Sequence, residues 1–277
     1  MTTIRLAILD MYTGVANEGM RCIRQLIRRA EAENQVHFVA ETFDVRGQNQ
    51  LPRLQDFDVF ISSGGPGSPL ATADAWETAY FGFIDELLAH NRAHDQKKYL
   101  LLICHSFQLV SRHLGLGELS QRKSTSFGVM PVHLTAAGRA DPVLHALPEP
   151  FYAVDSRDYQ LTHPDLDRVA ELGAEILCLE KERPYVALAR AVMAVRFSPE
   201  VLGTQFHPEA DGEGMLRYML TAERKQQVIT AYGEDKYEEM VRLLADPTTI
   251  ELTEGIVVPT FLRLAVAQLT PELVPAG

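Results

Sequence analysis

Three short stretches of the chain carry residue types that together could attack a carbonyl carbon. The first is Cys104, which follows five apolar residues and precedes apolar residues at helical spacing. The second is the glycine-rich segment 62–69, and the third is His207-Pro208-Glu209. Each of the three also has an ordinary structural explanation, so their combination matters more than any one of them.

Cys104 is placed by the sequence at a turn between a strand and a helix. The apolar run 99–103 predicts a strand covered on both faces, and the residues from 106 to Gly115 predict a helix. The first amides of a helix are free and its dipole favours negative charge, so this position favours the reactive thiolate. The alternative is a small buried hydrophobic residue, the commoner role of a free cysteine.

The glycine-rich segment follows another predicted strand, 57–61. A phosphate cradle is one interpretation, but the segment lacks the lysine of a P-loop and does not fit Gly-x-Gly-x-x-Gly. Glycines after a strand also let backbone amides approach a small ligand closely. We therefore favour a site where these amides act as hydrogen-bond donors.

His207 and Glu209 are two residues apart after a predicted strand, 201–206. Residues two apart in an extended segment point to the same side, so the carboxylate can reach the imidazole. A carboxylate that orients a histidine prepares it to act as a general base. The alternative is a surface His-Pro-Glu turn.

The elements that carry these residues predict an α/β fold. Strands at 4–9, 36–43, 57–61 and 99–103 with helices between them predict a doubly wound, mostly parallel sheet with helices on both faces. Short apolar runs after Gly115 predict an antiparallel extension of that sheet. These runs are 128–134, 151–154, 175–179, 185–189 and 192–197.

The last part of the chain is predicted to be helical, ending with a short apolar helix at 261–269. We expect an α/β domain at 1–220 and a helical C-terminal extension at 221–277 that packs on it. This extension could cap the domain, cover the active site or form a homodimer contact.

Composition excludes several classes of function. Among 277 residues, 26 Lys and Arg face 37 Asp and Glu, a net charge of −11, which disfavours general binding to nucleic acid or an anionic membrane. Three cysteines without a Cys-x-x-Cys pair disfavour disulfides and structural zinc, and no apolar run approaches the ~20 residues of a membrane span. We expect a cytoplasmic protein without a metal site.

Taken together, these motifs resemble the class I glutamine amidotransferases. The resemblance rests on Ser63-Gly-Gly-Pro66, on Ile103-Cys104 with Gln108, and on Gly203-Thr-Gln-Phe-His207-Pro-Glu209, and it covers about residues 4–220. It implies that Cys104 attacks the γ-amide of glutamine, that His207 relays the proton and that Glu209 holds His207, with no cofactor. It further implies an oxyanion hole from the backbone amides of Gly65 and His105. Substrate contacts are implied for Gln108, Ser156 and Arg157.

The chain departs from the family pattern in two places. Leu102 and Ser106 stand where the family usually has glycine, which relieves crowding at a tight turn. Ser156-Arg157 stands where the family has a Ser-His pair in its glutamine-binding loop. These departures concern the shape of the turn and the identity of the substrate.

Three functions follow as hypotheses. The first is a glutamine amidotransferase-type hydrolase that forms a cysteinyl thioester and passes ammonia to a separate synthetase. The second keeps the same three residues in a γ-glutamyl hydrolase or peptidase, where Arg157 could bind an additional carboxylate. The third is a binding module without turnover, suggested by Leu102 and Ser106.

Overall fold

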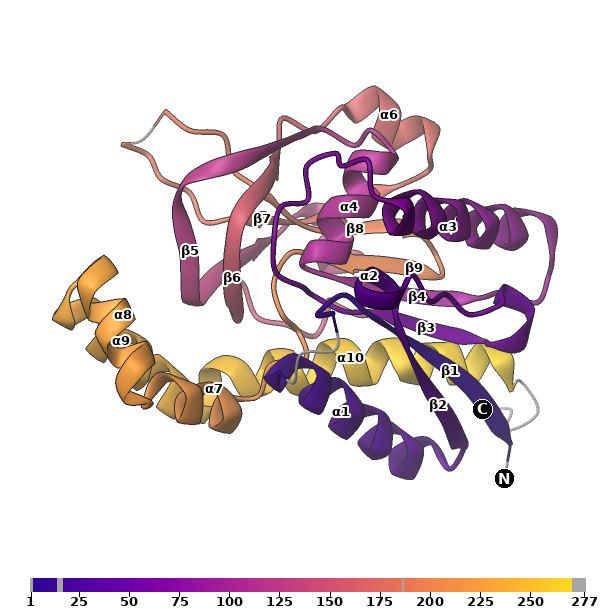
Figure 1. The fold of residues 1–277 in the computed structure, drawn as a ribbon, viewed down its shortest axis with the longest axis horizontal. Helices are drawn as coiled ribbons and strands as arrows, with labels where there is room; N and C mark the ends of the chain where they lie inside the picture. The colour runs from indigo at the N-terminus through magenta and orange to yellow at the C-terminus, as the bar shows by residue number, and fades with distance from the viewer. Residues whose placement is uncertain (1, 14–16, 186, 271–277) are drawn as a thin grey trace.

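A mixed sheet lies at the centre of the computed structural model, which describes residues 2–13, 17–185 and 187–270 (Figure 1). The sheet has nine strands in the order β2-β1-β3-β4-β9-β8-β7-β5-β6. Its first five strands run parallel, with β4 paired to β3 on one side and to β9 on the other. They are β2 (His37–Asp44), β1 (Thr3–Asp10), β3 (Val59–Ser62), β4 (Tyr99–Ile103) and β9 (Val201–Thr204).

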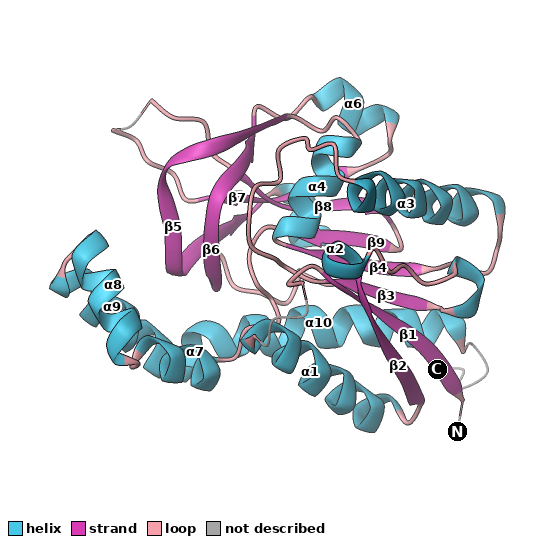
Figure 2. Ribbon diagram, in the orientation of Figure 1, coloured by secondary structure: helices cyan, strands magenta, loops and turns pink. Residues whose placement is uncertain are grey.

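The remaining four strands are antiparallel, as predicted, but two are longer than expected. They are β8 (Val192–Ser198), β7 (Glu175–Glu180), β5 (Glu118–Leu134) and β6 (Phe151–Thr162), and β5 and β6 form the long curved pair in Figure 2. The strand predicted at 185–189 is wrong for Tyr185 and 187–189, which belong to no strand, and Val186 lies outside the described residues. Tyr185 is 97% exposed and Leu188 is 46% exposed, so these apolar side chains lie on a surface loop.

Helices cover both faces of the sheet, which confirms the predicted doubly wound architecture. Along β1, Leu6 and Ile8 point into a core shared with α1 (Glu18–Asn34) and α10 (Pro247–Leu269). Ala7 and Leu9 point to the opposite core, shared with α3 (Ala75–Ala93) and α4 (His105–His113). Side chains that alternate along one strand thus contribute to both cores.

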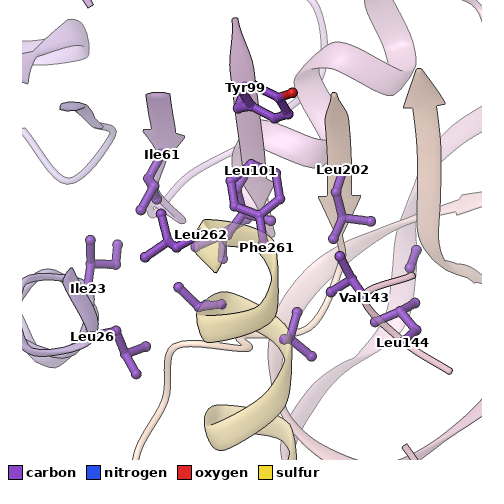
Figure 3. Packing of buried hydrophobic residues seen from close by; sticks show 14 of the residues in the cluster. Ile23, Leu26, Ile61, Tyr99, Leu101, Val143, Leu144, Leu202, Phe261 and Leu262 are labelled. Carbon is purple, nitrogen blue, oxygen red and sulfur yellow. The ribbon is translucent and has the colours of Figure 1, made fainter. Parts of the chain in front are cut away.

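Helix α10 is longer than the predicted helix at 261–269, because Pro259 lies inside it and does not end it. Proline removes one backbone donor and usually breaks a helix. Here apolar residues on both sides of Pro259 are buried against the sheet, and tertiary packing keeps the helix continuous. Figure 3 shows Phe261 and Leu262 of α10 beside Leu101 of β4 and Ile61 of β3.

A third, smaller core lies where the C-terminal helices meet the β5–β6 pair. Tyr237 and Met240 of α9 pack there with Phe127 and Val129 of β5. The remaining helices are α2 (Val45–Gln48), η1 (Leu54–Asp56), α5 (Ala136–Ala140), α6 (Leu166–Glu171), α7 (Gly212–Met219), α8 (Ala222–Tyr232) and α9 (Glu234–Ala245). Within the described ranges, none of the helices combines the length and apolarity needed to cross a bilayer.

Candidate active site

Cys104 lies at a sharp turn between β4 and α4, as the sequence predicts. Its backbone has φ 48° and ψ −97°, a conformation that side chains rarely adopt and that concentrates at functional sites. The Cys104 amide donates to the carbonyl of Thr204 at 2.7 Å, and the Cys104 carbonyl accepts from the Gln108 amide at 3.0 Å. These bonds to β9 and α4 hold the strained residue in place.

Leu102 and Ser106, the two departures from glycine, both find room around this turn. Leu102 is fully buried in the core that contains Phe107. The Ser106 hydroxyl, also fully buried, donates to the carbonyl of Ser63 at 2.5 Å. The turn at Cys104 therefore accommodates Leu102 and Ser106, the two side chains that suggested a binding module without turnover.

The glycine turn follows β3, whose neighbour in the sheet is β4. A Cβ added at Gly65 would lie 2.5 Å from the carbonyl oxygen of Met11, too close for any side chain. A Cβ added at Gly64 would lie 2.8 Å from Cε1 of His207. Glycine at these positions therefore lets the turn approach both Met11, which follows β1, and the imidazole of His207.

Replacing Gly64 by alanine is expected to displace His207 and to slow alkylation of Cys104 by iodoacetamide about tenfold at pH 7, because the thiolate loses its cationic neighbour. The rate of loss of free thiol measures this effect. Gly82→Ala is the matched control, because an added Cβ meets nothing within 4 Å in α3. An alkylation rate for Gly64→Ala equal to that of the control would contradict the prediction.

His207 and Glu209 follow β9 and are in direct contact. His207 Nδ1 lies 2.8 Å from Glu209 Oε1, and the Glu209 side chain is 1% exposed. The His207 amide donates to the carbonyl of Val154 at 2.9 Å, which fixes the backbone as well. Burial alone would lower the pKa of His207, but the charges of Glu209 and of the Cys104 thiolate outweigh it and raise the pKa well above 6.5.

The spatial grouping follows from sheet topology. The glycine turn, Cys104 and His207 come after β3, β4 and β9, which are adjacent parallel strands. Carboxyl ends of parallel strands meet at one edge of a sheet, the usual place for a site in this architecture. These residues are up to about 140 positions apart in the sequence, and the order of the strands in the sheet brings them together in space.

Gln205 lies next to Cys104 and Gln108, a placement that sequence reasoning missed. Its Oε1 accepts from Gln108 Nε2 at 2.8 Å, and its Nε2 lies 3.6 Å from Cys104 Sγ. Gln108 Nε2 also donates to the carbonyl of Tyr159 at 3.0 Å. Gln205 precedes His207 by two residues, so the same spacing argument that joined His207 to Glu209 would have found it.

The polar segment around Ser156 and Arg157, where the resemblance implies a glutamine-binding loop, lies inside β6. Ser156 is exposed, and its carbonyl lies 3.8 Å from Cys104 Sγ. The Arg157 side chain is 1% exposed and is paired with Asp155 at 2.9 Å and with Glu180 at 3.2 Å. Strand alternation turns these neighbours to opposite sides, so a substrate contact through the Arg157 guanidinium has to compete with two carboxylates.

His105 follows Cys104 directly but has a different environment from His207. It is 2% exposed, and burial together with Arg46 and Arg112 lowers its pKa to about 3. His105 is therefore neutral at pH 7. A neutral imidazole with so low a pKa is a poor general base there.

Replacing His105 by phenylalanine is expected to make the protein less sensitive to acid. In the wild type the unfolded chain binds a proton below pH 6.5 that the folded chain refuses until about pH 3. The free energy of unfolding therefore falls with decreasing pH in this window, by up to about 1.4 kcal/mol per pH unit. Urea unfolding at pH 4.5 to 7 measures the slope; equal slopes for the variant and the wild type would contradict the prediction.

A cavity of about 840 Å³ opens over Cys104, His207 and Gln108. Tyr12, from the segment after β1, also lines it and escaped the sequence analysis. Burial raises the pKa of Tyr12, so its hydroxyl stays protonated. No group of three or more His, Cys, Asp or Glu side chains is placed to hold a metal ion in the part of the chain that the structure describes.

The sequence model of the glutamine amidotransferase class-I family matches residues 8–224. The chain belongs to this family. Among curated proteins, the glutamine amidotransferase-like protein YfeJ of Salmonella typhimurium is 28% identical over 113 residues, which is 41% of this chain and 46% of YfeJ. The match thus spans about half the length of that relative.

Solved structures of glutamine amidotransferases share this fold. A glutamine amidotransferase from Thermotoga maritima has a TM-score of 0.67 at 14% identity, covering 95% of this chain and 98% of that one. A glutamine amido transferase from Methylobacillus flagellatus has a TM-score of 0.63 at 13% identity, covering 100% and 98%. At such identities the likeness concerns the fold, and the chemistry has to be argued from the site.

Proposed function

We propose that this glutamine amidotransferase hydrolyses the side-chain amide of glutamine through a cysteinyl thioester and passes the ammonia to a separate synthetase. The observation that carries the proposal is the convergence of Cys104 and the His207–Glu209 pair on one cavity. The three described cysteines are unpaired, which suits a reducing, cytoplasmic location. The proposed partner is the synthetase that receives the ammonia. A homodimer is part of the same proposal.

In the first half-reaction, Cys104 Sγ attacks the carbonyl carbon of the glutamine γ-amide. The raised pKa of His207 favours the imidazolium, and therefore the thiolate beside it. The C–N bond breaks as His207 gives a proton to the leaving ammonia, and a thioester remains on Cys104. Because Nδ1 of His207 is held by Glu209, Nε2 is the nitrogen left for proton transfer.

In the second half-reaction, a water molecule attacks the thioester. His207 takes the proton from this water, the C–S bond breaks, and glutamate leaves with Cys104 restored. Negative charge develops on the carbonyl oxygen in both halves. Following the resemblance, we assign its stabilisation to the backbone amides of Gly65 and His105. Each such donor is worth roughly 3 kcal/mol to the barrier.

A chloroketone analogue of glutamine tests the proposal directly. We expect it to alkylate Cys104, with glutamine protecting, and peptide mass spectrometry identifies the modified residue. Cys22 and Cys178 are internal controls, because both are buried and burial raises the pKa of both thiols. Labelling of Cys104 by iodoacetamide but not by the analogue would show that the cavity rejects glutamine.

A γ-glutamyl hydrolase or peptidase is the second candidate, and the cavity volume favours it. About 840 Å³ lies near the upper end of the ~300–1,000 Å³ typical of pockets for drug-sized ligands, well beyond glutamine alone. The leaving group would then be an amine larger than ammonia. Initial rates on a panel of γ-glutamyl amides decide between the two, since free glutamine would be a poor substrate for this alternative.

A further inference from the structure

Three buried hydroxyl groups form a hydrogen-bonded chain between α3, β3 and α4, and this chain ends on a backbone carbonyl. Tyr80 OH lies 2.9 Å from Ser62 Oγ, which lies 2.8 Å from Ser106 Oγ. Ser106 Oγ lies 2.5 Å from the carbonyl oxygen of Ser63. Tyr80, Ser62 and Ser106 are all fully buried, so water does not compete for these bonds.

The Ser63 carbonyl, which ends this series of hydrogen bonds, determines which hydroxyl donates and which accepts in each of them. A carbonyl oxygen only accepts, so Ser106 uses its one proton on Ser63. Ser106 Oγ must then accept from Ser62, and Ser62 Oγ must accept from Tyr80. The result is a single ordered arrangement with one orientation for each hydroxyl.

The hydroxyl of Ser63 continues the restraint into the glycine turn. It accepts from the Met11 amide at 2.9 Å and donates to the carbonyl of Gly64 at 2.9 Å. The Gly64 carbonyl and the Gly65 amide belong to one planar trans peptide, in which C=O and N–H point in opposite directions. Fixing the Gly64 carbonyl therefore fixes the direction of the Gly65 amide.

This peptide needs an external restraint because it joins two glycines. Without Cβ atoms, Gly64 and Gly65 have more backbone conformations available than other residues, and the peptide between them can rotate at little cost. An amide that donates to a developing oxyanion is effective only if its direction is set in advance. The restraints on this peptide and its predecessor come from Ser63 and Ser106.

We infer that Ser63 and Ser106 are positioning residues that keep the Gly65 amide directed into the cavity. The inference rests on the proposed function, in which Gly65 supplies an oxyanion donor. Ser106 holds the Ser63 carbonyl, and Ser63 holds the Gly64 carbonyl. Ser106 thereby links α4, the helix that follows Cys104, to the glycine turn that carries Gly65, one of the two proposed oxyanion donors.

Ser106→Ala is expected to lower kcat for glutamine hydrolysis about tenfold, less than the ~10²–10³ lost with a whole donor. KM stays within about threefold, because the lost interaction acts in the transition state. The alkylation rate of Cys104 by iodoacetamide stays unchanged, since that displacement develops no oxyanion. A merely structural defect would alter alkylation and KM as well.

Ser111→Ala is the matched control. Ser111 is a fully buried serine of the same helix, and its hydroxyl has no hydrogen-bond partner among the described residues. Its removal should leave kcat unchanged. Ser63→Ala is the second positioning variant, used if Ser106→Ala does not fold, and its expected kcat loss is at least as large because it frees the Gly64 carbonyl directly.

A crystal structure of the Ser106→Ala protein gives a readout independent of turnover. We expect the Gly64–Gly65 peptide to be rotated or to occupy two orientations. A single unchanged orientation, or a kcat equal to that of Ser111→Ala, would overturn the inference. If the wild type does not turn over glutamine, the proposed function fails, and the orientation of this peptide still decides the positioning role.

Discussion

Cys104→Ser is expected to lower the rate of glutamate release from glutamine by at least ~10⁴-fold, the scale seen when a nucleophile is removed from a catalytic set. A thiol next to a protonated imidazole ionises readily, whereas a hydroxyl at the same place stays protonated and attacks poorly. The substitution changes the side chain at the strained turn only slightly, because one oxygen atom replaces one sulfur atom. Glutamate release from purified proteins under saturating glutamine measures the effect.

Cys178→Ser is the control for this experiment. Cys178 is fully buried in the core and does not line the cavity over Cys104, and burial raises the pKa of its thiol well above the usual value, so it stays protonated at pH 7. We expect its rate to equal that of the wild type. Equal rates for Cys104→Ser and the wild type would remove Cys104 from the mechanism and with it the assignment as a thioester-forming enzyme.

Glu209→Gln is expected to cost about 10⁴-fold in kcat, the loss found when the orienting carboxylate of a catalytic histidine is neutralised. Glutamine keeps the shape and can still accept from His207 Nδ1, but its amide can also turn and offer a donor, which selects the wrong tautomer. The charge is lost in either case. This charge is one of the causes that raise the pKa of His207.

The pH profile separates the loss of charge from a loss of structure. Since Glu209 raises the pKa of His207, its neutralisation lowers that pKa. The imidazolium is then lost earlier as pH rises, so the alkaline limb of kcat/KM moves to lower pH. Glu18→Gln, a change to another carboxylate of the same cavity, should leave this limb in place. A limb that does not move in Glu209→Gln would contradict the assigned role.

The parallel half of the fold could be predicted from the sequence because its signals are local. Each of β1, β3 and β4 is a compact apolar run followed by a turn and a helical pattern. Such units pack in only a few ways, and their carboxyl ends must share one edge. This is why Cys104 could be placed at a strand-to-helix turn without any structure.

The antiparallel half of the sheet is harder to predict from the sequence, because the order of these strands along the chain does not imply which of them pair. The apolar run at 185–189 resembles a strand, but the described residues in it pair with nothing. The substrate contact expected for Arg157 rests on the resemblance and on its positive charge. Its position inside β6, facing Asp155 and Glu180, depends on pairing with β5 that no local pattern reveals.

The residues that connect parts of the site could not be predicted from local sequence patterns either. The sequence indicates only that the Ser106 side chain is crowded at the tight turn, whereas in the structure its hydroxyl donates to the carbonyl of Ser63, 43 positions away. Tyr12 reaches the cavity because β1 lies next to β3 in the sheet. Sequence reasoning found the groups that could react, and the structure was needed to find the groups that hold them.

Helix α10 also constrains the order in which this protein can mature. It is synthesised after all nine strands, yet Phe261 and Leu262 cover the face of the sheet that holds Ile61 and Leu101. Until α10 emerges from the ribosome, that face stays open, and exposed apolar surface on an incomplete chain favours aggregation. The covering of this face therefore waits for α10, although the strands that form the sheet are synthesised earlier.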